Sequence, residues 1–121
     1  MENVAVIGAS PNQDRYSNKA MRLLAQYNHN PIPIAPKYEQ IEGKKVYQSL
    51  KDISEKIDTV TMYIGPARQD TAIINDIVKL APRRVIFNPD TENKAVYEQL
   101  KQAGIEVVEA CTLVLLKTNQ Y

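Results

Sequence analysis

Hydrophobic residues along the chain fall into short runs that alternate with longer amphipathic stretches. Residues 4–7 form a continuous apolar run that Gly8 ends, which is typical of a parallel strand buried on both faces. After a polar loop, apolar residues recur at helical spacing from Ala20 to Tyr27, and this pattern predicts a helix that begins near Ser17 as its N-cap. The first part of the chain therefore predicts a strand, a turn and a helix.

The same alternation continues to the end of the chain. The prolines within residues 31–36 predict a strand start or an edge strand, because each proline removes a ladder hydrogen-bond donor. Residues 38–55 are mixed and predict only a brief strand at 45–47 and a short amphipathic helix at 50–53. Further strands are predicted at 58–64, 84–88 and 105–110. Further helices are predicted from Pro66 onward and at 93–103, where Gly104 ends the helix. After the last strand, residues 113–116 form a final apolar run, an apolar return toward the core.

This order of elements indicates the fold class. Strands that alternate with helices form a parallel sheet through right-handed crossovers, with helices on both faces. We therefore predict an α/β fold with a Rossmann-like, doubly wound, mainly parallel sheet in which the first strand is central. The length of 121 residues fits one domain over residues 1–121, because about 100 to 150 residues is the commonest domain size.

Composition narrows the classes of partner. The 15 Lys and Arg residues against 14 Asp and Glu residues leave a net charge of +1, without the basic excess that nucleic acid or an anionic membrane attracts. No apolar run approaches the roughly 18 residues of a membrane span, and no basic signal-peptide region precedes the first strand. We expect a cytoplasmic protein without nucleic-acid or membrane partners, and the single Cys111 fits a reducing compartment. The sequence identifies no protein partner.

The turn after the first strand is the first candidate for chemistry. In doubly wound sheets ligands bind at the carboxyl ends of the strands, and a helix N-terminus offers unpaired N–H groups and a positive dipole to phosphate. Gly8 permits close backbone approach, Ser10 adds a hydroxyl donor and Arg15 adds a cation. The segment GASPNQ is not G-x-G-x-x-G, so a glycine that only ends a strand before a loop is the alternative interpretation.

The end of the second strand bears on the kind of nucleotide. An NAD site needs Asp or Glu there to accept a hydrogen bond from the ribose 2′-hydroxyl. This chain has Ala35, Pro36 and Lys37 instead. A lysine in this place favours a ribose that carries a phosphate, as in NADP or coenzyme A, and an ordinary exposed lysine explains it equally well.

Several of these segments together resemble a known family. The segments VIGASPNQDRYS, PIAPK, GKKVYQSL and DTVTMYI are similar to those of small bacterial coenzyme A-binding proteins, and the similarity spans nearly the whole chain. These proteins are Rossmann-like CoA-binding domains, related to the CoA-binding domain of succinyl-CoA ligases. The chain departs from the family pattern at Ala35, where Asn is frequent, and at residues 86–88, where a Trp-x-Gln motif is frequent.

The resemblance implies that the chain binds CoA without turnover. The diphosphate would contact the first turn, and the adenosine would lie across the ends of the second strand and of the strand at 58–64. The cofactor-binding residues implied in this way are Gly8, Ala9, Ser10, Asn12, Arg15, Tyr16, Ser17, Pro36, Lys37, Gly65 and Pro66.

Candidates for catalysis are few. His29 is the only histidine and is expected at the end of the first helix, away from the ligand edge. Cys111 follows the last strand with no base near it in sequence, and is interpreted either as a buried apolar residue or as a thiol that faces the pantetheine arm. We therefore favour a binding protein that is not an enzyme and has no metal site. The alternatives are an NADP-dependent oxidoreductase subunit, for whose substrate domain 121 residues leave no room, and a nucleotide-responsive interaction domain.

Overall fold

The computed structural model describes residues 1–121, and its centre is a five-stranded sheet in the order β2-β1-β5-β6-β7. Every neighbouring pair of strands in this sheet is parallel. Counted alone, the sheet strands follow the second-first-third-fourth-fifth order of flavodoxin-like doubly wound sheets, so the predicted α/β fold class is confirmed. The strands of the sheet are β1 (Asn3–Ile7), β2 (Asn30–Ile34), β5 (Thr59–Met62), β6 (Arg84–Phe87) and β7 (Glu106–Glu109).

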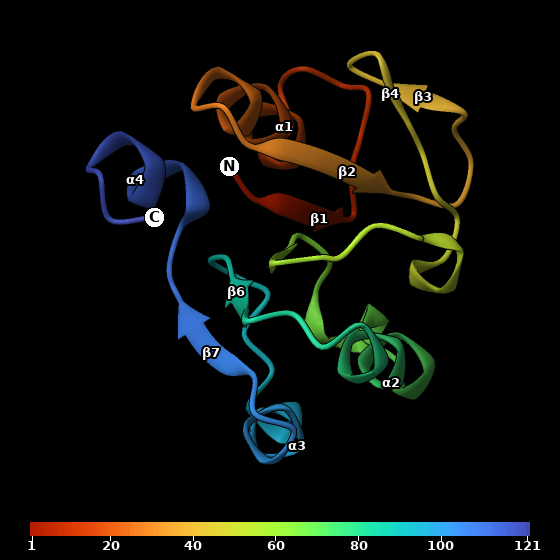
Figure 1. The fold of residues 1–121 in the computed structure, drawn as a ribbon, viewed down its shortest axis with the longest axis vertical. Coiled ribbons are helices and arrows are strands. Elements are labelled where there is room, and N and C mark those ends of the chain that lie inside the picture. The colour runs from red at the N-terminus through yellow and green to blue at the C-terminus, as the bar shows by residue number, and fades with distance from the viewer.

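Helices cover both faces of the sheet (Figure 1). The helices α1 (Tyr16–Gln26) and α4 (Thr112–Lys117) lie together on one face. The helices α2 (Thr71–Leu80) and α3 (Lys94–Gln102) lie on the other face. None of these helices has the length and apolar character needed to cross a membrane.

The two faces of β1 belong to two separate hydrophobic clusters. Val4 and Val6 pack in the cluster of α1 and α4, while Ala5 and Ile7 pack in the cluster of α2 and α3. All four side chains are buried, as the continuous apolar run predicts. Burial of a Val or Ile side chain contributes about 1.5 to 3 kcal/mol, and this packing fixes the carboxyl end of β1.

The first strand is interior but not central. β1 lies between β2 and β5, and the middle position belongs to β5. The prediction of a central first strand is therefore wrong by one position. In β5, Val60 and Met62 are fully buried, and the buried Thr61 hydroxyl forms a hydrogen bond of 2.8 Å with Thr112. Both strands are buried on both faces, so burial pattern alone does not show which of them is in the middle.

The first helix begins earlier than predicted. α1 starts at Tyr16 with Arg15 as its N-cap residue, and Ser17 is buried inside the first turn. The prediction of Ser17 as the N-cap is therefore wrong. No side chain caps α1, so its first amide groups remain available to other partners.

The segment after β5 also differs from the prediction. Pro66 begins the short 3-10 turn η2 (Pro66–Arg68) instead of a long α-helix. The helix α2 starts only at Thr71, where Asp70 caps it by accepting a hydrogen bond of 2.9 Å from the amide of Ile73. Proline fits the first position of either element, so the residue type does not distinguish them.

The mixed segment between β2 and β5 forms small elements. A two-stranded antiparallel hairpin, β3 (Gln40–Ile41) and β4 (Lys44–Lys45), replaces the single brief strand expected at 45–47. The short helix predicted at 50–53 is the 3-10 turn η1 (Leu50–Asp52). The apolar return at the end of the chain is the helix α4, which packs against α1.

Candidate functional site

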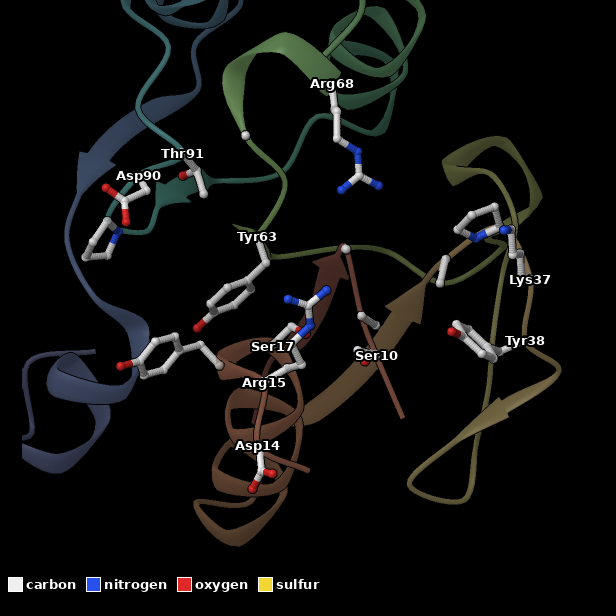
Figure 2. Close-up of a pocket in the computed structure, with 17 residues that line it drawn as sticks. Ser10, Asp14, Arg15, Ser17, Lys37, Tyr38, Tyr63, Arg68, Asp90 and Thr91 are labelled. Atoms are coloured by element: carbon white, nitrogen blue, oxygen red, sulfur yellow. The ribbon is translucent and has the colours of Figure 1, made fainter. Parts of the chain in front are cut away.

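A cavity of about 720 Å³ opens at the carboxyl edge of the sheet (Figure 2). We call it the edge cavity, and its volume lies within the ~300–1,000 Å³ of typical small-molecule sites. The chain leaves β1 toward β2 but leaves β5 toward β6, so the edge cavity lies at the topological switch point of the sheet. It is lined by Gly8, Ala9, Ser10, Asp14, Arg15, Tyr16, Ser17, Ala35, Pro36, Lys37, Tyr38, Tyr63, Gly65, Arg68, Pro89, Asp90 and Thr91.

Gly8 is required by the backbone conformation and by packing. Its φ of 91° lies in the left-handed region, and an added Cβ would lie 2.8 Å from Cγ2 of Ile64 and 3.1 Å from the carbonyl carbon of Tyr63. The amide groups of Gly8 and Ala9 both donate to the carbonyl oxygen of Ile34, at 3.1 and 3.2 Å. These two amides are therefore already occupied, which the sequence did not indicate.

Several other amide groups at the edge cavity have no hydrogen-bond partner. Those of Ser10, Tyr16 and Ser17 lie together at the first turn and the start of α1. Tyr16 and Ser17 are the first two residues of α1, whose N-terminus carries the positive end of the helix dipole. Because the first amides of a helix lack an intrahelical acceptor, an anion is a suitable partner for them.

The loop that precedes α1 is held in place by Asn18, a buried residue of that helix. Its side-chain nitrogen donates to the carbonyl oxygen of Ser10 at 2.9 Å and to Glu42 at 3.1 Å, and its oxygen accepts from Arg22 at 2.8 Å. Arg22 also donates to the carbonyl oxygen of Gln13 at 2.9 Å. The network fixes the loop, and with it the free amide of Ser10.

Three cationic side chains line the edge cavity: Arg15, Lys37 and Arg68. None of them forms an ion pair. They come from the loop before α1, the end of β2 and η2, and Figure 2 shows Arg15 and Arg68 extending toward the same space from opposite sides. Two carboxylates, those of Asp14 and Asp90, also line the cavity. Unpaired guanidinium groups bind phosphate through charge-assisted hydrogen bonds, so the cavity suits an anionic ligand.

Most of the predicted site residues come together at the edge cavity. The exceptions are Asn12 and Pro66, which do not line it. The side chain of Asn12 accepts a hydrogen bond of 3.0 Å from the amide of Asp14 within the loop, and Pro66 is the first residue of η2. The predicted residues that do line the cavity are Gly8, Ala9, Ser10, Arg15, Tyr16, Ser17, Pro36, Lys37 and Gly65.

Sequence reasoning missed several lining residues, above all Arg68. The signal was present, because Gly65 and Pro66 mark the end of a buried strand and the polar residues that follow lie at the same edge of the sheet. The same argument applies to Pro89 after β6. The missed lining residues are Asp14, Ala35, Tyr38, Tyr63, Arg68, Pro89, Asp90 and Thr91.

Tyr63 contributes an uncharged surface to the edge cavity. Its hydroxyl group is buried and makes no hydrogen bond. Burial, followed by the proximity of Cys111, raises the pKa of Tyr63, so the phenol is neutral at physiological pH. Cys111 is the N-cap residue of α4 and does not line the cavity, so the interpretation of its thiol as facing a ligand arm gains no support from the cavity.

His29 lies at the opposite, amino edge of the sheet, as predicted. Its Nδ1 accepts a hydrogen bond of 3.1 Å from the amide of Glu2. The structure contains no group of three or more His, Cys, Asp or Glu side chains placed to hold a metal ion. The groups available for chemistry at the edge cavity are therefore amides, hydroxyls, cations and two carboxylates.

Comparison with known proteins identifies the family. The family model of the CoA binding domain matches residues 2–117. The chain is 35% identical over 127 residues to an ADP-forming acetate–CoA ligase of Methanocaldococcus jannaschii, with 98% of this chain and 18% of the ligase covered. It is 34% identical over 106 residues to an ADP-forming acetate–CoA ligase of Archaeoglobus fulgidus, with 85% of this chain and 14% of the ligase covered. The chain therefore belongs to the CoA-binding domain family, which confirms the resemblance noted in the sequence.

A solved structure has the same fold over its whole length. The crystal structure of an uncharacterized protein superposes with a TM-score of 0.93 at 40% identity, with 100% of this chain and 98% of that chain covered. The chain spans only 18% and 14% of the lengths of the two ligases, which are therefore much longer. The similarity to the ligases thus concerns one part of each ligase.

Proposed function

We propose that the protein binds coenzyme A, or an acyl-CoA, in the edge cavity and does so without catalysing a reaction. The observation that carries the proposal is that the free amides of Ser10, Tyr16 and Ser17 line the same cavity as three unpaired cations. A diphosphate supplies the negative charge and the acceptor oxygens that these groups lack. Membership of the CoA-binding domain family supports CoA as the molecule that carries this diphosphate.

The proposal changes the roles that the resemblance implied within the first turn. Gly8 and Ala9 shape the turn, because their amides are bound to Ile34. The donors to phosphate are Ser10 and the first two residues of α1. Arg15 and Arg68 supply charge, and Lys37 at the end of β2 contacts the phosphate on the ribose. Asn12 and Pro66 act through the loop and η2 without contacting the ligand.

Binding without catalysis is the part of the proposal that rests on the lining residues. Neither His29 nor Cys111 lines the edge cavity, and the only acidic side chains that line it are Asp14 and Asp90. The similarity to two ligases favours a second candidate function, in which the chain supplies the CoA-binding part of a larger acyl-CoA ligase assembly. We keep the cytoplasm as the proposed location, where both CoA and a free thiol such as Cys111 stay reduced.

Titration calorimetry with four nucleotides tests the proposal. CoA should bind most tightly, followed by dephospho-CoA, with NADP and NAD weaker. Each lost charge-assisted contact is worth roughly 1.5 to 3 kcal/mol, so Lys37→Ala should weaken CoA about tenfold to a hundredfold while leaving dephospho-CoA nearly unchanged. Tighter binding of NADP than of CoA would favour the oxidoreductase alternative, and binding of none of them below millimolar concentration would overturn the proposal. Release of free thiol from acetyl-CoA by the purified protein would contradict the non-catalytic part.

A further inference from the structure

The two outer strands of the sheet differ in how their free sides are protected. The outer side of β2 is covered, because the amide of Tyr47 donates to the carbonyl oxygen of Pro33 at 3.0 Å and that of Ala35 donates to the carbonyl oxygen of Tyr47 at 3.1 Å. Pro31 and Pro33 also carry no N–H group. β7 ends the other side of the sheet and has no strand beyond it. An uncovered outer strand offers its backbone groups to another chain.

The backbone groups of Val107 and Glu109 point away from the sheet. The amides of Glu106 and Ala110 donate to carbonyl oxygens at or next to the two ends of β6, at 3.1 and 3.2 Å. Because successive residues of a strand turn their backbone groups to opposite sides, the N–H and C=O groups of Val107 and Glu109 face outward, where no strand receives them. We call this outer side of β7, with the backbone groups of Val107 and Glu109, the β7 flank.

Apolar side chains beside the β7 flank are left uncovered. β7 is the one strand of the sheet without a buried residue, although its two middle residues, Val107 and Val108, are valines. The helix that follows, α4, contains the apolar run 113–116, of which only Leu116 is buried. Val114 is 54% exposed, and no other valine, leucine or isoleucine of the chain is exposed. Figure 1 shows β7 and α4 along the same side of the molecule, with no other element outside them. Uncovered apolar residues beside an open strand indicate a contact with another protein chain.

We infer that the β7 flank pairs in antiparallel fashion with the β7 flank of a second copy of the chain, about a two-fold axis at Val108. In this register Val107 of one copy faces Glu109 of the other, and each such pair exchanges both of its N–H···O bonds. Every outward donor and acceptor of the flank then has a partner. The Val108 side chain meets its own copy in a non-hydrogen-bonded pair, in which side chains come closest. The two sheets become one continuous sheet.

The charges and amides of β7 exclude the neighbouring registers. With Val108 on the axis, both glutamates of β7 face uncharged residues of the second copy. If Glu109 faced its own copy, like charges would lie directly opposite each other and destabilise the pair. If Val107 faced its own copy, Glu109 would need the amide of Ile105, which already donates to Leu100 at 3.0 Å. The flank is thus self-complementary in a single register, which favours a second copy over an unrelated strand as the occupant.

The pairing leaves the edge cavity open. Antiparallel strands point their carboxyl ends in opposite directions, so the edge cavities of the two copies lie at opposite ends of the pair. No residue of β7 or α4 lines that cavity. The inference therefore does not rest on CoA binding, and the variants that test it should keep the CoA affinity of the wild type.

Sedimentation velocity over about a hundredfold range of protein concentration tests the inference, because the fraction of dimer depends on concentration. Wild-type protein should approach twice the mass of the chain as the concentration rises. Val108→Lys places like charges opposite each other on the axis and should be monomeric throughout, and so should Val108→Glu. An equal mixture of these two variants should form a mixed dimer, because the charges that meet on the axis are then opposite.

Val78→Lys is the matched control, because Val78 is also a half-buried valine but lies on α2, away from β7 (Figure 1). It should dimerise as the wild type does. Val107→Pro tests the backbone pairing alone. It removes an amide that has no partner within the chain, so the variant should keep its fold, as circular dichroism measures, and should lose the dimer.

Three outcomes would overturn the inference. The first is a wild type that stays monomeric at the highest concentration. The second is a Val108→Lys or Val107→Pro dimer as stable as that of the wild type. The third is a mixture of Val108→Lys and Val108→Glu that stays monomeric, which would remove the two-fold axis from Val108.

Discussion

The two edges of the sheet carry similar polar side chains and use them in opposite ways. At the amino edge, Glu2 pairs with Arg83, and the Thr59 hydroxyl donates to Glu2 at 2.9 Å while accepting from Arg84 at 3.0 Å. The guanidinium carbon of Arg84 lies 4.3 Å from the ring centroid of Tyr121, and its outer nitrogen lies 3.7 Å from Glu2. The charges of Glu2, Arg83 and Arg84 are therefore matched within the protein, although Nη2 of Arg84 and the Tyr121 hydroxyl are buried there without a hydrogen bond.

At the carboxyl edge the charges are left unmatched. Arg15, Lys37 and Arg68 make no ion pair, and free amides line the same cavity. Polar groups that are buried normally find partners within the protein or in water, so groups left unpaired around a cavity are available to a ligand. The comparison teaches that pairing, more than residue type, separates structural polar residues from binding ones in this fold.

The largest expected effect comes from Gly8→Val, which breaks the geometry of the carboxyl edge. A branched residue at a φ of 91° is strained by about 1 to 3 kcal/mol, and overpacking against Ile64 adds about 1 to 3 kcal/mol. Urea denaturation should therefore show a loss of about 2 to 6 kcal/mol in the free energy of unfolding. CoA binding should be lost as well.

Gly104→Val is the matched control for that variant. Gly104 also has a positive φ, of 80°, but nothing lies within 4 Å of an added Cβ. It should suffer only the backbone strain and keep CoA binding. Equal losses of stability in the two variants would contradict the packing role given to Gly8.

The next effect concerns the amino edge, where Glu2→Gln removes the acidic partner of two arginines. The Arg84 side chain is only 7% exposed, so the loss should cost about 1 to 3 kcal/mol of unfolding free energy and leave CoA affinity within about twofold. Urea denaturation and calorimetry measure the two effects. A large fall in CoA affinity would show that the two edges are not independent.

The pH dependence of stability gives the same residue a second test. Burial alone would raise the pKa of Glu2, but hydrogen bonds from Arg83 and Thr59 and the charge of Arg84 outweigh it and lower the pKa below the ordinary 4.5. A carboxyl group with a lowered folded pKa stabilises the protein above its unfolded pKa, and this stability is lost as the pH falls through the folded value. Lowering the pH below 4.5 should therefore reduce the unfolding free energy of the wild type more than that of Glu2→Gln, as urea denaturation at several pH values measures. If the unfolding free energy of Glu2→Gln falls with pH as much as that of the wild type, the pairing of Glu2 with the arginines is refuted.

Replacing one arginine at each edge should give smaller effects, and the two variants together sharpen the comparison. Arg68→Ala should weaken CoA binding about tenfold and change the unfolding free energy by no more than about 0.5 kcal/mol. Arg83→Ala should leave CoA binding unchanged and cost about 0 to 1 kcal/mol, because that side chain is 57% exposed. The reverse pattern would invalidate the division between paired and unpaired edges.

Local patterns in the sequence were sufficient for the fold class. The apolar run of β1 and the glycine that follows it locate the first turn, and Lys37 locates the end of β2 at the same edge. These features are local, since strand burial and helix spacing are properties of neighbouring residues. Even so, the start of α1 at Tyr16 was missed, because Ser17 is a good capping residue by type and is buried in the first turn instead.

Features that depend on pairing between distant segments could not be predicted from the sequence. The register of β1 against β2 places the carbonyl oxygen of Ile34 on the amides of Gly8 and Ala9, and no local pattern encodes that register. Arg68 joins the edge cavity only because β5 lies beside β1. Asp76 is one polar position of an amphipathic helix in the sequence, and only the packed structure shows that it is largely buried.

The central claim is that a diphosphate binds the free amides of the carboxyl edge, and amide NMR on the protein titrated with CoA tests it most directly. The amide resonances of Ser10, Tyr16 and Ser17 should shift strongly, and their hydrogen exchange should slow, because they gain an acceptor. The amide of Gly8, already bound to Ile34, should keep its slow exchange. Slowed exchange at Gly8 with no change at Tyr16 and Ser17, or no change at any of these amides at saturating CoA, would contradict the account.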